Sequence, residues 1–207
     1  MAASSVPPVS LEGHPLTAVR MAFAHLVSLS DQAWNAYMQL FSPHELAAGE
    51  FFVQAGTTAD SIALVTSGAL REYFVTRDGK EFIKAFVLPG QFTGSLFDLL
   101  SGEPSTANIQ TLKPTQLWVA PYGKVRVLYD LYPEWERVGR LLTEDLFIKK
   151  ARREYEFLTM DATERYLNLL AQQPDLEQHV PQYHIASYLG ITPVALSRIR
   201  RAVQRGS

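Results

Sequence analysis

Between residues 43 and 122 the hydrophobic residues follow the two-residue period of β-strands. Short runs rich in β-branched and aromatic residues alternate with turns that contain glycine. The Asp78-Gly79 pair is typical of a tight hairpin, because glycine accepts positive φ. The expected strands are Glu50–Gln54, Ser61–Thr66, Ala69–Thr76, Glu81–Leu88 and Leu117–Ala120. Many short strands at near-regular spacing predict an antiparallel barrel or sandwich.

Helical periodicity flanks this region on both sides. Two short helices are expected between Pro15 and Leu40, and a long helix is expected from Pro133 to about Leu158. The apolar stripe of the long helix consists of Trp135, Val138, Leu142 and Leu146. This stripe either packs on the chain's own barrel or pairs with the same helix of a second copy across a dimer axis. Beyond Leu146 the stripe gives way to lysine and arginine, so any pairing is expected to loosen there.

The composition excludes several kinds of site. The 207 residues contain no cysteine, which rules out disulfides, thiolate metal sites, cysteine-ligated iron–sulfur clusters and thiol switches. The first ten residues lack a basic stretch followed by an apolar run, and no segment approaches the ~18 consecutive apolar residues of a membrane helix. We therefore expect a cytoplasmic protein with no membrane partner.

The residue content of the sequence also argues against an enzyme. No histidine occurs between residues 45 and 178, whereas metal-dependent chemistry in a small barrel needs a His-X-His pair and a glutamate around one ion. The sequence also lacks a Gly-X-Ser-X-Gly elbow and a phosphate-binding glycine loop. We expect neither catalysis nor a bound metal.

The segment from Pro181 to Arg201 predicts a helix-turn-helix. Gly190 supplies the positive φ that ends a first helix, Thr192 caps a second helix, and Pro193 occupies its first position, where the missing N–H costs nothing. The inward-facing residues are Ile185, Ala186, Leu189, Ile191, Leu196 and Ile199. The alternative is a purely structural helical hairpin.

The second helix of this segment presents side chains suited to the DNA major groove. Val194, Ser197 and Arg198 face outward near its start, where arginine can bind guanine and serine can donate or accept. The other expected DNA contacts are Thr192 at the cap and, for phosphates, Arg200, Arg201 and Arg205. Residues 181–207 hold four arginines and no acidic residue, whereas residues 1–180 carry a net charge of −6. A basic end on an acidic body is the footprint expected of a nucleic-acid-binding terminus, but the charge alone is explained equally well by a solvated basic tail.

The order of these parts resembles the cyclic-AMP receptor/FNR (Crp/Fnr) family of transcription regulators over about residues 20–205. The resemblance rests on two stretches, the run of glycine turns from Gly49-Glu50-Phe51-Phe52 to Pro89-Gly90-Gln91-Phe92 and the segment from Ile185 to Arg201. It implies an α+β fold with an antiparallel, jelly-roll-like β-roll sensor over residues 15–132, a dimerisation helix over 133–158 and a DNA-binding helix-turn-helix over 159–207. It also implies a homodimer on double-stranded DNA, paired through the apolar stripe of the long helix, with RNA polymerase and a small-molecule effector as further partners.

The sequence departs from the family pattern at the nucleotide pocket. Members that bind cyclic AMP carry a Gly-Glu-Leu run, whose glutamate holds the ribose hydroxyl, and a later arginine that neutralises the cyclic phosphate. Here Ser95 stands for the glutamate and Ser105 for the arginine. A buried phosphate without its arginine loses a charge-assisted contact, so cyclic AMP is not expected to bind tightly. The expected pocket residues are Phe92, Gly94, Ser95, Leu96, Phe97, Ser105 and Thr106.

Two alternatives to this regulator stay open. One is a regulator that does respond to a cyclic nucleotide, because Thr106 and backbone amides could cradle an anion weakly. The other is a ligand-binding or protein-interaction module without DNA binding. No cofactor is expected and the effector is unidentified. Only six residues follow Arg201, so the two-stranded wing that usually comes next in the family is expected to be absent or vestigial.

Overall fold

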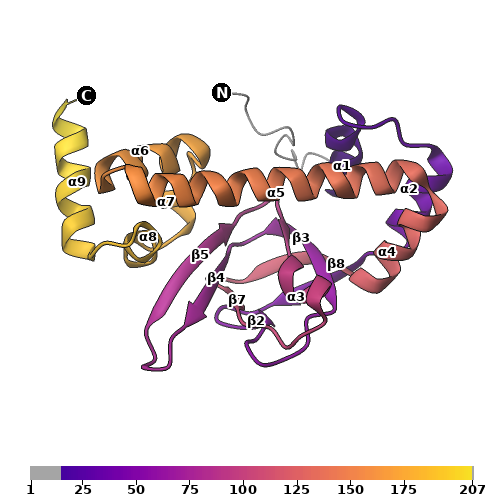
Figure 1. Ribbon diagram of the computed structural model, residues 1–207, viewed down its shortest axis with the longest axis horizontal. Helices are drawn as coiled ribbons and strands as arrows, with labels where there is room; N and C mark the ends of the chain where they lie inside the picture. Colours follow the sequence, from indigo (N-terminus) through magenta and orange to yellow (C-terminus); the bar gives the residue numbers. More distant parts are fainter. Residues whose placement is uncertain (1–14, 207) are drawn as a thin grey trace.

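The computed structural model describes residues 15–206. Figure 1 shows a long helix, α5 (Pro133–Thr159), spanning the molecule above a β-roll. Helices α1 (Pro15–Ala24), α2 (Asp31–Met38) and α4 (Tyr122–Leu131) gather at one end of α5, and the C-terminal helices gather at the other. This architecture confirms the predicted fold class, an antiparallel β-roll followed by a long helix and an all-helical C-terminal part.

The roll consists of two four-stranded antiparallel sheets. The first has the order β1 (Ser42–Leu46), β8 (Thr115–Pro121), β3 (Ser61–Ser67), β6 (Phe92–Thr93). The second has the order β2 (Phe51–Val53), β7 (Asn108–Thr111), β4 (Leu70–Val75), β5 (Glu81–Val87). Fully buried Val65, Leu70 and Ile109 lie in the core between them. The five predicted strands are present, whereas β1, β6, β7, the helix α3 (Leu96–Ser101) and α4 were not predicted.

The first half of α5 is buried in the chain's own core. The Trp135 ring stacks on Tyr37 with centroids 4.2 Å apart, and its indole Nε1 donates to the backbone oxygen of Ala33 at 2.9 Å. Val138 is 1% exposed, and half-buried Leu142 packs against the same cluster of α1, α2 and α4 residues. The expectation that Trp135 and Val138 meet a partner helix is therefore wrong, because intramolecular packing already covers them.

The second half of α5 carries its open apolar face. Leu146 is half-buried, whereas Phe147 is 70% exposed and Leu158 is 78% exposed. Ile148 and Tyr155 are exposed beside them. Aromatic and aliphatic residues alternate there with the basic ones, so the stretch beyond Leu146, where any pairing was expected to loosen, still has an exposed apolar face.

The C-terminal part contains α6 (Ala162–Gln172), α7 (Leu176–His179), α8 (Gln182–Leu189) and α9 (Pro193–Gly206). Asp161 and Glu164 form a capping box at the start of α6. Ile185 and Leu189 of α8 share one buried cluster with Ile83 and Phe86 of β5, so this part is packed directly on the roll. No helix within residues 15–206 is long and apolar enough to cross a membrane.

Candidate nucleic-acid interface and sensor pocket

The helix-turn-helix has the predicted geometry at its turn. Gly190 follows α8 with φ of 71°, and its backbone N–H donates to Ser187 O at 3.1 Å. The positive φ favours glycine, and a Cβ at this position would lie 3.1 Å from Cε1 of Phe157 on α5, so a side chain here would force Phe157 to shift by a few tenths of an ångström. The Thr192 hydroxyl accepts from the N–H of Ala195 at 3.2 Å and caps α9 as expected. The angle between α8 and α9 is thereby fixed locally.

Helix α9 divides into a buried face and an open face. Leu196 is fully buried, while Val194 is 63% exposed and Arg198 is exposed next to it. The Arg201 guanidinium donates to Ser197 Oγ at 3.3 Å, so these two expected contacts lie together on one side of the helix. The structure therefore brings Val194, Ser197, Arg198 and Arg201 to a single accessible surface.

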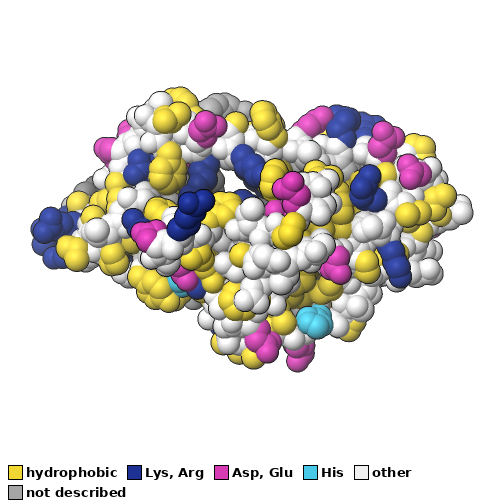
Figure 2. Space-filling model, turned by 60° about the horizontal axis from the view of Figure 1, so that its bottom comes forward, with side chains coloured by type: hydrophobic (Ala, Val, Ile, Leu, Met, Phe, Trp, Pro, Cys, Tyr) yellow, Lys and Arg dark blue, Asp and Glu magenta, His cyan; other side chains and the backbone are white. Residues whose placement is uncertain are grey.

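Arg200 differs from its neighbours on α9. Its Nε lies 2.9 Å from Oε1 of Glu177 on α7, and that carboxylate also accepts from the Tyr166 hydroxyl at 2.9 Å. The half-buried guanidinium is therefore partly neutralised and held towards α6 and α7. Exposed Arg198, Arg201 and Arg205 supply the free positive charge at this end of the molecule, where Figure 2 shows basic side chains gathered.

Two arginines that sequence reasoning missed hold the end of α8 against the roll and the neighbouring helices. Arg153 of α5 donates to the backbone oxygens of Ile83 and Tyr188, each at 3.2 Å. Arg165 of α6 donates to Leu189 O at 3.1 Å. Tyr188 and Leu189 end α8, whose last carbonyls have no partner within the helix. For Arg153 the sequence signal was the run of lysine and arginine near the end of the long helix, which was interpreted as the end of the apolar stripe.

The predicted pocket residues separate into two groups. Phe92 stacks on Phe23 with centroids 6.3 Å apart and belongs to the N-terminal core, where Leu96 also packs. Phe97 is 59% exposed, and Thr106 is exposed. Gly94 has φ of 146°, a conformation that favours glycine. The predicted residues that the fold buries at a common point are Ser95 and Ser105, each 3% exposed.

That common point is the side chain of Asp98, which sequence reasoning missed. Asp98 is 2% exposed, and its Oδ2 accepts from Ser105 Oγ at 2.6 Å. Burial opposes the charge, but the hydroxyls of Ser105 and Ser95 and the backbone of Thr106 outweigh it, so the pKa of Asp98 lies below its ordinary value. The carboxylate is therefore ionised at neutral pH.

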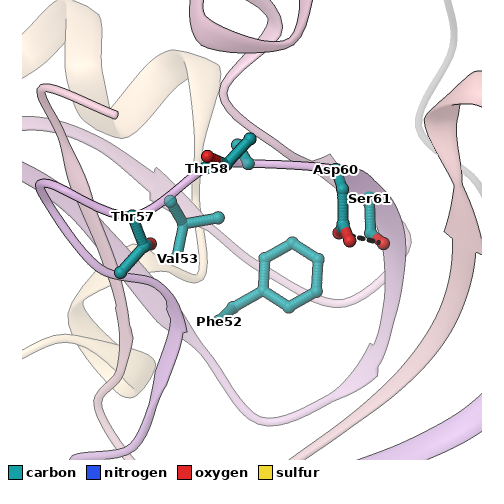
Figure 3. A pocket seen from close by; sticks show the side chains of 7 residues that line it. Phe52, Val53, Thr57, Thr58, Asp60 and Ser61 are labelled. Carbon is teal, nitrogen blue, oxygen red and sulfur yellow. Dashed lines mark hydrogen bonds between the residues drawn. The ribbon is translucent and has the colours of Figure 1, made fainter. Parts of the chain in front are cut away.

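A separate small cavity lies on the loop between β2 and β3 (Figure 3). Its volume is about 40 Å³, and it is lined by Phe52, Val53 and residues 57–61. The Ser61 hydroxyl donates to Asp60 at its edge, over 2.7 Å. Ligand pockets usually measure ~300–1,000 Å³, so this space suits a few waters at most. Among residues 15–206 no cluster of His, Asp and Glu could hold a metal ion.

Comparison with known proteins agrees with this geometry. The family model described as the cyclic nucleotide-binding domain matches residues 43–132. The chain is 28% identical over 170 residues to the transcriptional activator protein anr of Pseudomonas aeruginosa, covering 74% of this chain and 67% of that one. It is 23% identical over 168 residues to the fumarate and nitrate reduction regulatory protein of Vibrio cholerae, covering 76% and 66%. The chain thus spans about two thirds of the length of these relatives.

A solved structure shows the same fold. FixK2 from Bradyrhizobium japonicum superposes with a TM-score of 0.67 at 20% identity, over 80% of this chain and 85% of that one. A cyclic nucleotide-binding β-roll joined through a long helix to a helix-turn-helix defines a class of two-part regulatory proteins. Within that class the chain is similar over about three quarters of its length to transcription regulators of the Crp/Fnr type, and residues 43–132 match the cyclic nucleotide-binding domain.

Proposed function

We propose that this chain is a dimeric, sequence-specific DNA-binding transcription regulator of the Crp/Fnr type. The observation that carries the proposal is the division of α9 into a buried face, anchored by Leu196, and an open face with Val194 and Arg198. A helix held this way behind a glycine turn can lie in a major groove with its first turns on the bases. The proposed parts are a sensor over residues 15–132, a dimerisation helix over 133–158 and a DNA-binding unit over 159–207.

Different side chains of α9 are proposed to contact the bases and the phosphates of the DNA. Val194, Ser197 and Arg198 would meet base edges, which carry sequence information. Arg201 and Arg205, on the second half of the helix, would meet phosphates, and Thr192 at the helix start would be a further contact. Arg200 would contribute less than the other arginines, because Glu177 already neutralises part of its charge. RNA polymerase is the expected further partner of a regulator bound at a promoter.

A second copy of the chain is the proposed partner of the open half of α5. Exposed Phe147, Ile148 and Leu158 supply an apolar face that one copy leaves in water. Thr143 and Glu144 line a shallow depression with Phe147 and Ile148, which suits interdigitation with a facing helix. Leu142 and Leu146, which are both half-buried, remain proposed contacts. Pairing along α5 would set two α9 helices at a fixed spacing.

The sensor is proposed not to hold cyclic AMP tightly. Ser95 and Ser105 replace the glutamate and arginine that would bind the nucleotide, and both are engaged with a carboxylate instead. Calorimetry with cyclic AMP tests this point, and micromolar affinity would contradict it. The matched relatives are transcription regulators, which supports a non-catalytic role.

The experiment that tests the whole proposal is selection of random duplex DNA by the purified protein with no nucleotide added. We expect an inverted repeat with half-sites about one helical turn apart. Binding to the selected site should weaken steeply with salt, because neutralised phosphates release counterions. A protein-interaction module would enrich no sequence, and its partner binding would depend little on salt if the contact is apolar.

A further inference from the structure

The sensor domain buries a negative charge at the place where a cyclic nucleotide would bring another. Asp98 of α3 and Ser105, just before β7, are each at most 3% exposed, and 2.6 Å separates the carboxylate Oδ2 from the serine Oγ. Ser105 is the residue that stands for the phosphate-binding arginine. Cyclic-AMP-binding family members have a positively charged arginine at this position. In this chain the position holds the Ser105 hydroxyl, which is hydrogen-bonded to the carboxylate of Asp98.

The donors around Asp98 form a filled anion site. The Ser105 hydroxyl, the Ser95 hydroxyl and the backbone of Thr106 all favour the charged form of the carboxylate. Ser105 Oγ is also bonded to the backbone of Ala107, which fixes it in place. Such a set of neutral donors resembles the cradle that a protein builds for a small anion, and here the chain's own side chain occupies it.

The charge of Asp98 is stabilised by neutral donors more than by a cation. Its Oδ1 is buried and has no hydrogen-bond partner among the described residues. Lys84 is the cation that favours its charge, and the Lys84 ammonium is itself ion-paired with Glu72. An approaching phosphate would therefore meet like charge in a water-poor setting, where repulsion is strong.

We propose that Asp98 is the specificity-determining residue of the sensor pocket: its carboxylate occupies the anion cradle of Ser95 and Ser105 and excludes anionic ligands, cyclic nucleotides among them. An effector of this pocket is then uncharged or cationic. The inference rests on the proposed function in one respect, that the sensor does not hold cyclic AMP tightly, and it names the group responsible. A merely structural Asp98 would tether α3 to the strand after it without affecting which ligand binds.

The test restores the missing nucleotide contacts with and without the internal anion. The proteins compared are the full chain, the double variant Ser95→Glu/Ser105→Arg, and the triple variant that adds Asp98→Asn. Calorimetry measures cyclic AMP binding, and thermal unfolding checks that each protein folds. Asp98→Leu, which keeps the same branched arrangement of side-chain heavy atoms without the charge, replaces Asp98→Asn if the asparagine variant is unfolded.

We expect the triple variant to bind cyclic AMP at least tenfold more tightly than the double variant, because Asp98 neutralises the introduced guanidinium in the double variant. Equal affinity of the two, or binding by neither, overturns the assignment of Asp98 while leaving the proposed function intact. Tight binding by the unmodified chain overturns both statements about cyclic AMP, and DNA selection without nucleotide remains a separate test of the regulator.

Discussion

The guanidinium of Arg71 on β4 lies 3.5 Å from Nδ1 of His184 on α8, so the sensor and the helix-turn-helix meet at a charged group facing an imidazole. Arg71 is held by an ion pair with Glu81 and by a hydrogen bond of 2.7 Å to Gln110. His184 is 6% exposed. Burial and then the charge of Arg71 lower the pKa of His184 to about 4, although Glu81 acts in the opposite direction.

This contact predicts that acid destabilises the folded chain. The unfolded chain protonates His184 near its ordinary pKa of 6.5, and the folded chain only near 4. Between these values the unfolded state binds more protons, so the free energy of unfolding falls as the pH falls, and above 6.5 this residue adds no slope. Denaturant unfolding at several pH values checks it. His184→Gln should reduce the slope. Equal slopes in the unmodified chain and the variant would contradict the prediction.

Substitutions of two arginines of α9 should affect DNA binding in different ways. Arg198→Ala is expected to cost roughly 1–3 kcal/mol of binding and to relax the choice at one base pair, because it removes a base contact. Arg205→Ala should weaken binding to all sequences alike and lower the salt dependence. Affinity measured on the selected site and on single-base variants separates the two. The same uniform loss for both variants would refute the base-reading role of Arg198.

The glycine turn is expected to tolerate no side chain. Gly190→Ala forces a positive φ on alanine and brings its Cβ to 3.1 Å from Phe157, so it should lower the free energy of unfolding by about 1–3 kcal/mol. Gly123→Ala is the matched control, since a Cβ there meets nothing within 4 Å and alanine favours the helix α4. Thermal and denaturant unfolding provide the comparison, and a loss no larger at Gly190 than at Gly123 would count against the stated geometry.

The open half of α5 should control assembly. Phe147→Glu places a charge on the proposed contact with a second copy and is expected to yield a monomer that binds the selected DNA weakly. Val127→Glu is the control, because Val127 is also exposed but lies on α4. Sedimentation analysis of both variants tests the prediction. If the Phe147→Glu variant is still a dimer, the contact between the two copies does not lie at Phe147.

Strands β3, β4 and β5 were predictable because each is a short run of β-branched and aromatic residues between glycine turns, and α5 because Pro133 opens a stretch with apolar residues at helical spacing. Strand β1 was missed because four of its five residues are exposed, and β6 because it has only two residues. Strand β7 contains polar Asn108, Gln110 and Thr111, whose burial depends on partners from distant segments. No local pattern carries such information.

Side-chain partners were harder to predict than elements. The period identified an apolar face at Trp135 and Val138 correctly, but a period cannot say whether the same chain or another covers that face. The turn at Gly190 was predictable because its requirements are local. Asp98 was not, since its role depends on Ser105, which lies across the turn after α3.

The two hydrogen bonds of Arg153 have a mechanical consequence. One guanidinium nitrogen joins the carbonyl of Ile83 in the roll to the carbonyl of Tyr188 at the end of α8. Moving α8 away from β5 would stretch and then break at least one of these hydrogen bonds, because one side-chain nitrogen cannot follow two acceptors that separate. The position of α8 on the roll, and with it that of α9, is therefore expected to depend on Arg153.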